Sequence, residues 1–500
     1  MTSGGTDMGG RAHADAPGPR ATVELGHSGG KLRTIDCIAE SLAVGPIFSA
    51  AAIGAILAGL SGGVGPFVII LTTVGILGLG YLISELAKRF SGSGTVYEYV
   101  AHTLGRKPAV FAAGAYHLAA ISLYAGIPII GGIFIKSFLA AHVNYDPPWW
   151  LAALAVLVFT IGVNLIGVQV SVRTQLLIII VSLVPFLILA VAIILEGGTT
   201  GNTVSVFNPD NIAEGGSVFK GLLFAILMFV GFELAGALGE ETERPQRSIP
   251  IAIIATILIV GAFYALTQYV GTIGSGGPDE LPFDFAVLGE TYVDRWLGVL
   301  IELAVILDIL AVGIGFTAAT SRGLFTLARD GLLPARLAAV NRADVPTVAT
   351  YTVGAIALAV IVIGLFVYGT GAPVDDTGAI IGPPDALNTF FVTSTIGAFV
   401  ICIVYVLVAV GGITYFAFRE SVPGAVLAGL VGLVTAAAGV AAQFIDGTAP
   451  VGDALWGRHL GLVLVAVVAV WLIVNIIVNP ARVAAAGDHA RRYDLGRPLS

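Results

Sequence analysis

The sequence predicts an all-α integral membrane protein with twelve transmembrane helices. Its 500 residues are 57% hydrophobic and 11% charged, whereas soluble domains carry about 25% charged residues. Twelve apolar runs are each about 20 residues or longer, which is enough to cross a hydrocarbon core of about 30 Å. The runs lie approximately at residues 36–60, 65–87, 109–138, 148–169, 174–195, 217–239, 249–273, 296–321, 346–368, 388–417, 423–444 and 459–478.

The basic residues predict the orientation of these helices. All but four of the 24 Lys and Arg residues lie in the two tails or in the even-numbered connections between helices. The four exceptions are Lys136, Lys220, Arg295 and Arg458. Basic residues concentrate on the cytoplasmic side of membrane proteins. We therefore expect a multi-pass protein of the cell membrane with both termini in the cytoplasm, which an even number of spans also requires.

We expect four regions along the chain. Residues 1–34 are polar and rich in Gly and Ala, without the apolar core of a signal peptide, and this composition predicts a disordered cytoplasmic tail. Residues 35–418 contain the first ten spans, which we expect to form a single core. Residues 419–480 contain helices 11 and 12, and residues 481–500 form a second cytoplasmic tail.

Two of the twelve apolar runs are interrupted. The first contains Gly45 and Pro46 in its middle, and proline removes a donor from the helical hydrogen-bond ladder. The sixth contains Gly231, where a helix can unwind without steric penalty, and Glu233, which is costly in a membrane unless it faces protein or water. Irregular backbone at mid-membrane is tolerated only where it lines a cavity. A pair of interrupted helices therefore indicates the binding site of a transporter.

The positions of the two interrupted helices predict an internal repeat. Helix 6 follows helix 1 by five spans, an odd number, so a second copy of helices 1–5 enters the membrane from the opposite side. We predict a 5+5 inverted repeat with discontinuous helices 1 and 6, and helices 11 and 12 as additions. The two halves show no evident sequence identity, so this prediction depends on the breaks and the span count.

The chemistry of the two breaks suits a zwitterion. Amide groups at the start of a half-helix, at the positive end of its dipole, attract a carboxylate, and exposed carbonyl groups attract an ammonium group. An α-amino acid can therefore be held without any charged side chain. We expect the carboxylate at helix 1, at Val44, Gly45, Pro46, Ile47, Phe48 and Ser49. We expect the ammonium group at helix 6, at Phe229, Val230, Gly231 and Phe232.

Three segments carry a family resemblance. FVGFE (229–233) with EETERPQRSIPIAI (240–253) looks like the sixth-helix motif of the amino acid–polyamine–organocation (APC) superfamily of permeases. SELAKRFSGSGTVYEYVAHTLG (84–105) is similar to its loop between helices two and three, and SRGLFTLARDGLLP (321–334) to its eighth-helix exit. The resemblance covers roughly residues 35–420. It implies an inverted-repeat secondary transporter of amino acids or related amines that binds the substrate backbone between the two unwound stretches.

The resemblance is imperfect at helix 1. Many members of the superfamily have a glycine-rich GSG-type string there, whereas this chain has VGPIFS. Pro46 removes one amide from the expected carboxylate site. The binding amides of the superfamily therefore cannot be assigned one by one to positions of this chain. Gly45 and Ser49 are the positions that the sequence favours, and a mere kink at Gly45-Pro46 is the alternative.

The sequence leaves three alternatives for energy coupling. Some superfamily members have a proton-responsive lysine in helix five, and Ser182 stands at that position here. Two acids remain as proton carriers: Glu233 beside the helix-6 break, and Asp308, which lies about 18 Å along helix 8 at about 1.5 Å per residue. Thr317 and Thr320 instead offer hydroxyls for a sodium ion, although such hydroxyls usually bond to their own helix. Exchange without coupling to an ion is the third alternative.

The sequence contains no enzyme motif that we recognise. It has no P-loop, no HExxH and no GxSxG between a strand and a helix, so we expect no catalytic residue, metal or cofactor. A net charge of −8 gives no sign of nucleic-acid binding. The expected partners are the lipid bilayer and a small amino acid or amine. The alternatives are a polyamine or organocation transporter of the same fold and a sensor that no longer transports, and the oligomeric state stays open.

Overall fold

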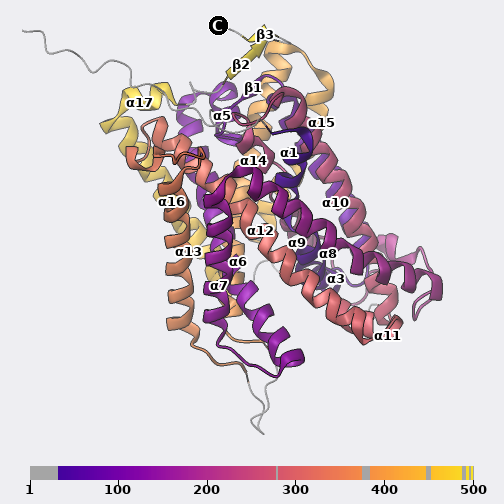
Figure 1. The fold of residues 1–500 in the computed structure, drawn as a ribbon. Coiled ribbons are helices and arrows are strands. Elements are labelled where there is room, and N and C mark those ends of the chain that lie inside the picture. The colour runs from indigo at the N-terminus through magenta and orange to yellow at the C-terminus, as the bar shows by residue number, and fades with distance from the viewer. Residues whose placement is uncertain are drawn as a thin grey trace, which may run out of the picture.

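The computed structural model describes residues 32–277, 280–373, 383–445, 452–486, 491–494 and 497–498. Residues 1–31 of the expected N-terminal tail therefore lie outside the described part. The described residues contain 12 helical segments that are long and apolar enough to cross a membrane (Figure 1). The prediction of a nearly all-helical protein with twelve spans is confirmed.

The first six spans contain both predicted breaks. Their helices are α1 (Thr34–Ser41), η1 (Leu42–Val44), α2 (Pro46–Phe48), η2 (Ser49–Ile53) and α3 (Gly54–Leu60) for the first span, then α4 (Gly65–Ala87), α6 (Arg106–Val143), α7 (Trp149–Ile166), α8 (Val168–Glu196), and α9 (Val218–Phe229) with η5 (Leu234–Leu238). The last six spans are α10 (Pro245–Ser275), α12 (Arg295–Arg329), α13 (Thr347–Tyr368), α14 (Leu387–Tyr415) with η8 (Phe416–Glu420), α15 (Pro423–Ala442) and α16 (Ala454–Val478).

Some helices extend beyond the apolar runs that predict them. The eighth run is predicted to end at residue 321, whereas α12 continues to Arg329. Its last two turns carry Arg322 and Arg329, and both side chains pair with buried glutamates. Because these charges are neutralised inside the protein, they do not end the helix as a hydropathy pattern alone suggests.

Several short elements connect the spans. Beyond the sequence prediction, the structure has the helices α5 (Val96–Thr103), α11 (Phe285–Tyr292) and α17 (Pro480–Ala485), and the short turns η3 (Ser205–Phe207), η4 (Pro209–Asn211) and η7 (Ala335–Ala338). Three strands, β1 (Phe90–Ser91), β2 (Arg491–Asp494) and β3 (Arg497–Pro498), pair antiparallel in that order. Phe90 pairs with Arg492, so the expected C-terminal tail joins the loop after α4.

The two interrupted spans lie at the centre of the bundle. The apolar window of the first span is 78% buried inside the protein and that of the sixth 89%, compared with 33% for α15 and 17% for α16. The last two spans therefore lie at the edge, where we expect lipid to cover them. α14 packs against α6 and α16, while α4 packs against α10 and α15. The inverted repeat stays a prediction.

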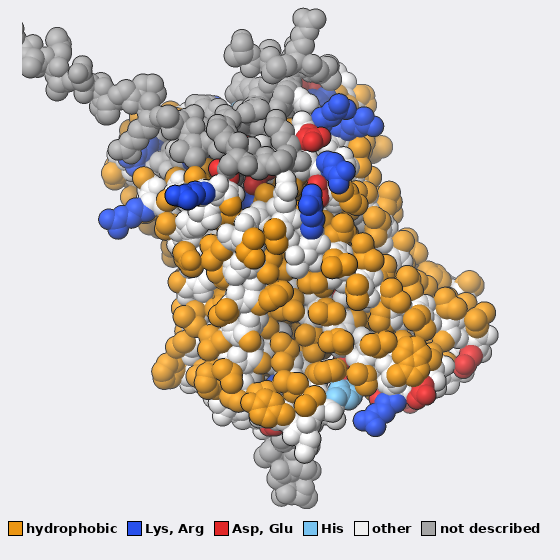
Figure 2. Space-filling model, viewed as in Figure 1, with side chains coloured by type: hydrophobic (Ala, Val, Ile, Leu, Met, Phe, Trp, Pro, Cys, Tyr) orange, Lys and Arg blue, Asp and Glu red, His pale blue; other side chains and the backbone are white. Residues whose placement is uncertain are grey.

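The two ends of the bundle differ in charge. In Figure 1, α5, α17 and the strands lie at one end, called here the α17 end, and α11 lies at the other, the α11 end. Figure 2 shows hydrophobic side chains covering the middle of one face and Lys and Arg side chains gathered at the α17 end. This distribution matches a protein that crosses a bilayer.

Candidate functional site

The first span is broken at its middle. After the 3₁₀ turn η1, Gly45 adopts a left-handed conformation with φ of +66°, and Pro46 then begins the second half of the span. A β-carbon at Gly45 would lie 2.2 Å from Cγ2 of Val312, so only glycine fits this close approach of the first span to α12. The Ser49 hydroxyl donates to the Val44 carbonyl across the break (2.9 Å). The span is unwound at this point and not merely kinked.

A carboxylate from another helix already occupies the amides at this break. Oδ2 of Asp308 on α12 accepts hydrogen bonds from the backbone N–H groups of Ile47 (2.9 Å) and Phe48 (2.8 Å). The Asp308 side chain is fully buried, and its Oδ1 atom has no hydrogen-bond partner. The acid that the sequence places near mid-membrane therefore lies directly at the predicted binding site.

The sixth span is broken at the predicted glycine. α9 ends at Phe229, Val230 is extended, and Gly231 has φ of +115°. Glu233 then folds back, so that its Oε2 accepts from the Gly231 N–H (3.3 Å) and its Oε1 from the Tyr116 hydroxyl (3.4 Å). The Glu233 side chain is buried, and these partners provide the protein environment that an acid inside a membrane requires.

The two breaks face each other. A β-carbon at Gly231 would lie 3.4 Å from both the amide nitrogen and Cγ1 of Val44, and the Ala235 N–H donates to the Ser41 hydroxyl (3.3 Å). Beside this contact lies a small cavity of about 40 Å³. Its lining comes from both breaks and from α6, α12 and α14, with Val44, Phe48, Ser49, Val230, Val312, Phe316, Phe390 and Ser394 among the residues.

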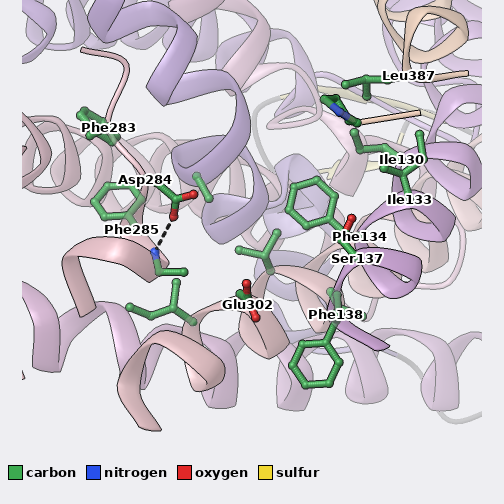
Figure 3. A pocket seen from close by; sticks show the side chains of 16 residues that line it. Ile130, Ile133, Phe134, Ser137, Phe138, Phe283, Asp284, Phe285, Glu302 and Leu387 are labelled. Atoms are coloured by element: carbon green, nitrogen blue, oxygen red, sulfur yellow. Dashed lines mark hydrogen bonds between the residues drawn. The ribbon is translucent and has the colours of Figure 1, made fainter. Parts of the chain in front are cut away.

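Two larger cavities continue from this site toward the α11 end. The first, of about 530 Å³, shares Ile53, Leu227, Phe390 and Ser394 with the small cavity. The described residues that line it are mostly apolar, and Lys220 is the one Lys or Arg among them. The second, of about 320 Å³, lies beside α11 (Figure 3).

The cavity beside α11 has a polar side. Figure 3 shows the rings of Phe134 and Phe285 together with the carboxylates of Asp284 and Glu302. Asp284 caps α11 by accepting from the Ala286 N–H (2.8 Å). Neighbouring cavities with shared lining residues therefore lie between the two breaks and one end of the bundle.

Buried ion pairs join the helices at the α17 end. Arg322 binds both carboxylate oxygens of Glu241 (2.6 and 3.2 Å), and Arg329 binds both of Glu240 (2.6 and 3.0 Å). Ser93 links the second pair to the loop before α5 through Glu240 (3.0 Å). Since all four charged side chains are at least nine-tenths buried, this end is closed to solvent between α12 and the sixth span.

One buried acid beside these pairs has an altered proton affinity. Glu98 of α5 is almost fully buried and accepts from the Gly94 N–H (2.9 Å). Burial, together with the nearby Glu240 carboxylate, raises the pKa of Glu98 to about 8. The α17 end therefore contains a carboxyl group that changes its charge near neutral pH.

The remaining predicted residues have different surroundings. Phe229 packs edge-on against Tyr264 (ring centroids 5.3 Å apart), and Phe232 packs against Tyr405 (5.8 Å), so both phenylalanines contact protein and neither lines the small cavity. Ser182, at the lysine position of the superfamily, is buried and its hydroxyl has no hydrogen-bond partner.

The predicted sodium ligands are only partly available. The Thr317 hydroxyl bonds back to the Gly313 carbonyl (2.7 Å), whereas the Thr320 hydroxyl is buried without a partner. Within the described ranges, no group of three or more His, Cys, Asp or Glu side chains could hold a metal ion. The sodium site at these hydroxyls stays a prediction.

The sequence reasoning missed several residues that build the site. Val312 and Phe316 line the small cavity, and they follow Asp308 at i+4 and i+8, on the same face of α12. Their helical spacing from Asp308 is the sequence feature that could have predicted them. Tyr264 of α10 donates its hydroxyl to the Met228 carbonyl (2.9 Å), just before the sixth-span break, and no sequence pattern marks this contact.

Comparison with known proteins identifies the family. The family model described as amino acid permease matches residues 38–479. An uncharacterized amino acid permease of Bacillus subtilis is 27% identical over 320 residues, which cover 59% of this chain and 69% of the relative. An uncharacterized transporter of Mycobacterium tuberculosis is 30% identical over 280 residues, 55% of this chain and 61% of the relative.

A plant relative has a named class of substrate. The vacuolar cationic amino acid transporter 2 of Arabidopsis thaliana is 27% identical over 298 residues, 55% of this chain and 46% of the relative. The chain thus matches between about half and two thirds of the length of these relatives. Because the family model covers most of the chain, the resemblance to the APC superfamily is confirmed, and the chain belongs to the amino acid permease family.

Proposed function

We propose that this protein is a secondary active transporter that moves amino acids across the cell membrane by alternating access. One observation supports this function above all: two central helices are broken at facing positions, beside cavities that lead to one end of the bundle. The other end is joined by buried ion pairs. Family membership and the names of the relatives favour amino acids as the cargo.

The positive-inside rule assigns the two ends. The α17 end carries the arginine-rich connections, so it faces the cytoplasm, and the cavities near α11 open to the outside. The structure then corresponds to an outward-facing state. Release to the cytoplasm requires the Arg322–Glu241 and Arg329–Glu240 pairs to separate, because they close the inner path. In an inverted repeat of helices 1–5 and 6–10, the two halves can exchange their conformations, which gives an outward-facing and an inward-facing state.

The two breaks share the recognition of the substrate. The Ile47 and Phe48 amides at the first-span break suit the substrate carboxylate, and the backbone carbonyls around Gly231 suit its ammonium group. The mostly apolar outer cavity, with Lys220 as the one Lys or Arg among its described residues, favours a neutral amino acid over a polyamine.

Protons are the coupling ion that the site supports best. Asp308 and Glu233 both touch a break, and both are acids enclosed in the bundle. Thr317 and Thr320 offer only neutral hydroxyl oxygens to a sodium ion, and the Thr317 hydroxyl donates to the Gly313 carbonyl, whereas each of the two acids can take up and release a proton. Exchange of one amino acid for another uses the same site without a net ion flux.

Uptake into proteoliposomes tests this function. The purified protein is supplied with labelled neutral, basic and acidic amino acids, each with an inward proton gradient, an inward sodium gradient, or neither. We expect uptake of neutral amino acids that increases with the proton gradient. Uptake only into vesicles preloaded with amino acid would indicate exchange. No uptake and no binding of any amino acid would exclude the proposed function.

A further inference from the structure

We propose that Asp308 occupies the place of the substrate carboxylate in the empty protein, and that an amino acid binds by displacing it. The displaced side chain then takes up one proton. This inference rests on the proposed function, because it explains how an amino acid and a proton bind together at the first-span break. It makes Asp308 a residue that sets both substrate specificity and coupling.

The backbone donors at the first-span break are all in use. The Gly45 N–H donates to the Leu42 carbonyl (3.1 Å), and the Ser49 N–H donates to the Gly45 carbonyl (2.8 Å). Pro46 has no N–H group. The two remaining amides of this stretch, at residues 47 and 48, donate to Asp308. A substrate carboxylate therefore finds no free amide between residues 45 and 49 unless Asp308 leaves.

The second break does not offer an alternative pair of donors. The Val230 and Phe232 N–H groups donate to carbonyls three residues earlier (3.1 and 3.2 Å), and the Gly231 N–H faces Glu233 (3.3 Å). Only one amide there points at a carboxylate, and its bond is long. Two adjacent amides at a helix start bind a carboxylate more strongly than one, so the site on α2 is the one for which two carboxylates compete.

Asp308 is positioned to exchange with a ligand. Its neighbours one and two turns along α12, Val312 and Phe316, line the small cavity, as does Phe48 on the other side of the hydrogen bond. The Asp308 carboxylate is bound unevenly, because Oδ2 accepts both bonds and Oδ1 accepts none. A substrate carboxylate entering from the cavity replaces these two bonds one for one.

The displaced carboxylate has no cation to pair with. Within the described residues no Lys, Arg or His side chain forms an ion pair with Asp308. The Tyr264 hydroxyl of α10 lies close enough for the Asp308 charge to affect it, and this hydroxyl carries no positive charge. An ionised acid without amides or a cation is costly inside a membrane protein.

The other helices packed against α12 do not supply a charge either. α2 and α7 contain no titratable residue, and α8 carries Arg173 and Glu196 toward its two ends. The other elements packed against α12 carry Glu290 and Tyr292 (α11), Tyr351 and Tyr368 (α13) and Arg336 (η7), and among the described residues none of these forms an ion pair with Asp308. α6 approaches this turn at Gly131, where a β-carbon would lie 3.0 Å from Cγ2 of Ile309. The first titratable residues on either side of Gly131 in the chain are Tyr124, bonded to the Thr160 hydroxyl, and Lys136, paired with Asp146. Proton binding is therefore the available way to neutralise a displaced Asp308.

The resulting step is balanced. The substrate carboxylate gains the hydrogen bonds of the two amides, the Asp308 carboxylate loses them, and one proton from the outer solvent converts it to the neutral acid. Release of the substrate on the cytoplasmic side allows Asp308 to return its proton and rebind the amides. One proton thus moves with each amino acid. An amine without a carboxylate does not compete for the amides and binds without a proton.

Calorimetric titration of the purified full chain tests the inference. The ligands are L-leucine and L-arginine, with 3-methylbutylamine and agmatine as the matched amines that lack only the carboxylate. Measuring the binding heat in buffers with different ionisation enthalpies gives the number of protons taken up per ligand. For the wild type we expect about one proton per bound amino acid and none per bound amine. The dissociation constant for amino acids then rises about tenfold per pH unit where uptake is complete.

Variants at Asp308 give the discriminating result. Asp308→Ala leaves the two amides free, so we expect it to bind amino acids at least tenfold more tightly at pH 8, without proton uptake. A residue that merely stabilised the site would weaken binding on truncation. Asp308→Asn keeps an oxygen that can accept from the amides but cannot take up a proton. If Asp308→Ala does not fold, the number of protons taken up per bound amino acid is measured with Asp308→Asn instead. Glu290→Gln, at an exposed acid of α11, is the control and should match the wild type.

Three results would overturn the inference. The first is equal proton uptake with amino acids and amines. The second is weaker amino acid binding by Asp308→Ala with the pH dependence retained. The third is proton uptake that persists in Asp308→Asn. Binding of the amines but of neither amino acid by the wild type would overturn the proposed function and this inference with it.

Discussion

The two broken spans are capped by carboxylates in different ways. At the first break the cap comes from another helix, since Asp308 of α12 accepts two bonds of 2.8 and 2.9 Å. At the sixth-span break the cap is local, since Glu233 lies two residues after Gly231 and accepts from it at 3.3 Å. A local cap moves with its own helix, whereas a cap from another helix ties two helices together. Glu233 also accepts from Tyr116 of α6 at 3.4 Å, but only at the first break does a residue of another helix bind the amides themselves. We therefore expect the occupancy of the first break to affect the position of α12.

The largest expected effect comes from Gly45→Ala. The added β-carbon would meet Val312 Cγ2 at 2.2 Å in a backbone with φ of +66°, so we expect a loss of about 3 kcal/mol in stability from overpacking and left-handed strain. Substrate binding should also be lost. Thermal unfolding in detergent and ligand binding provide the measurements.

Two further variants separate the two causes of that loss. Val312→Ala in the Gly45→Ala background removes the clashing methyl group and should recover part of the stability. Gly201→Ala introduces an alanine at φ of +81° in open space and should cost only about 1 kcal/mol. If Gly45→Ala is no less stable than Gly201→Ala, the close approach to α12 is not what holds the first break in place.

Gly231→Leu should affect the second break without unfolding the protein. A β-carbon at Gly231 meets its nearest neighbours only at 3.4 Å, but φ of +115° disfavours any L side chain, and a leucine would extend toward Val44. We expect binding to be abolished while the unfolding temperature falls by only a few degrees. Size-exclusion chromatography confirms folding. Retained binding would place the ammonium group elsewhere.

Asp308→Asn and Glu233→Gln should separate coupling from affinity. Asp308→Asn is expected to make amino acid uptake the same at pH 5.5 and pH 7.5 within about twofold, because its side chain cannot take up the proton. Glu233→Gln should keep the pH dependence and weaken binding by about fivefold, which corresponds to about 1 kcal/mol for its long hydrogen bonds. The reverse assignment of these two results would identify Glu233 as the proton carrier.

The last prediction concerns the α17 end, where no break lies and where we expect the smallest effect on substrate binding. The pKa of Glu98 is raised to about 8 in the closed structure, so the folded protein binds more protons than the unfolded chain between pH 5 and pH 8. Stability therefore falls as pH rises through this window, by up to about 1.4 kcal/mol per unit. Glu98→Gln should remove this slope and leave the pH dependence of substrate binding unchanged. Unfolding temperatures measured from pH 5 to pH 9 provide the test.

Much of the fold could be predicted because hydropathy and span length are local properties. The twelve spans follow from runs of apolar residues, and the break at Gly45-Pro46 follows from backbone chemistry that does not depend on neighbours. The far end of α12 was missed for the opposite reason. Whether Arg322 ends a helix depends on Glu241, which lies 81 positions away in the chain.

The candidate site could be predicted only in part. The sequence favoured Gly45 and Ser49 for the carboxylate, yet their amides bond within the break, and Ile47 and Phe48 present the amides that hold a carboxylate. Tertiary contacts decide this difference. The same holds for Phe229 and Phe232, whose rings pack against tyrosines of α10 and α14.

The membrane class, the twelve spans, the two interrupted helices and the acid within the eighth span could all be predicted from the amino-acid sequence. These features are predictable because each one depends on local composition or on the conformational limits of Gly and Pro. Only the tertiary structure showed that Asp308 reaches the amides of a helix 260 residues away in the chain. That contact depends on how α12 crosses the first span, and no local pattern encodes a crossing between distant helices.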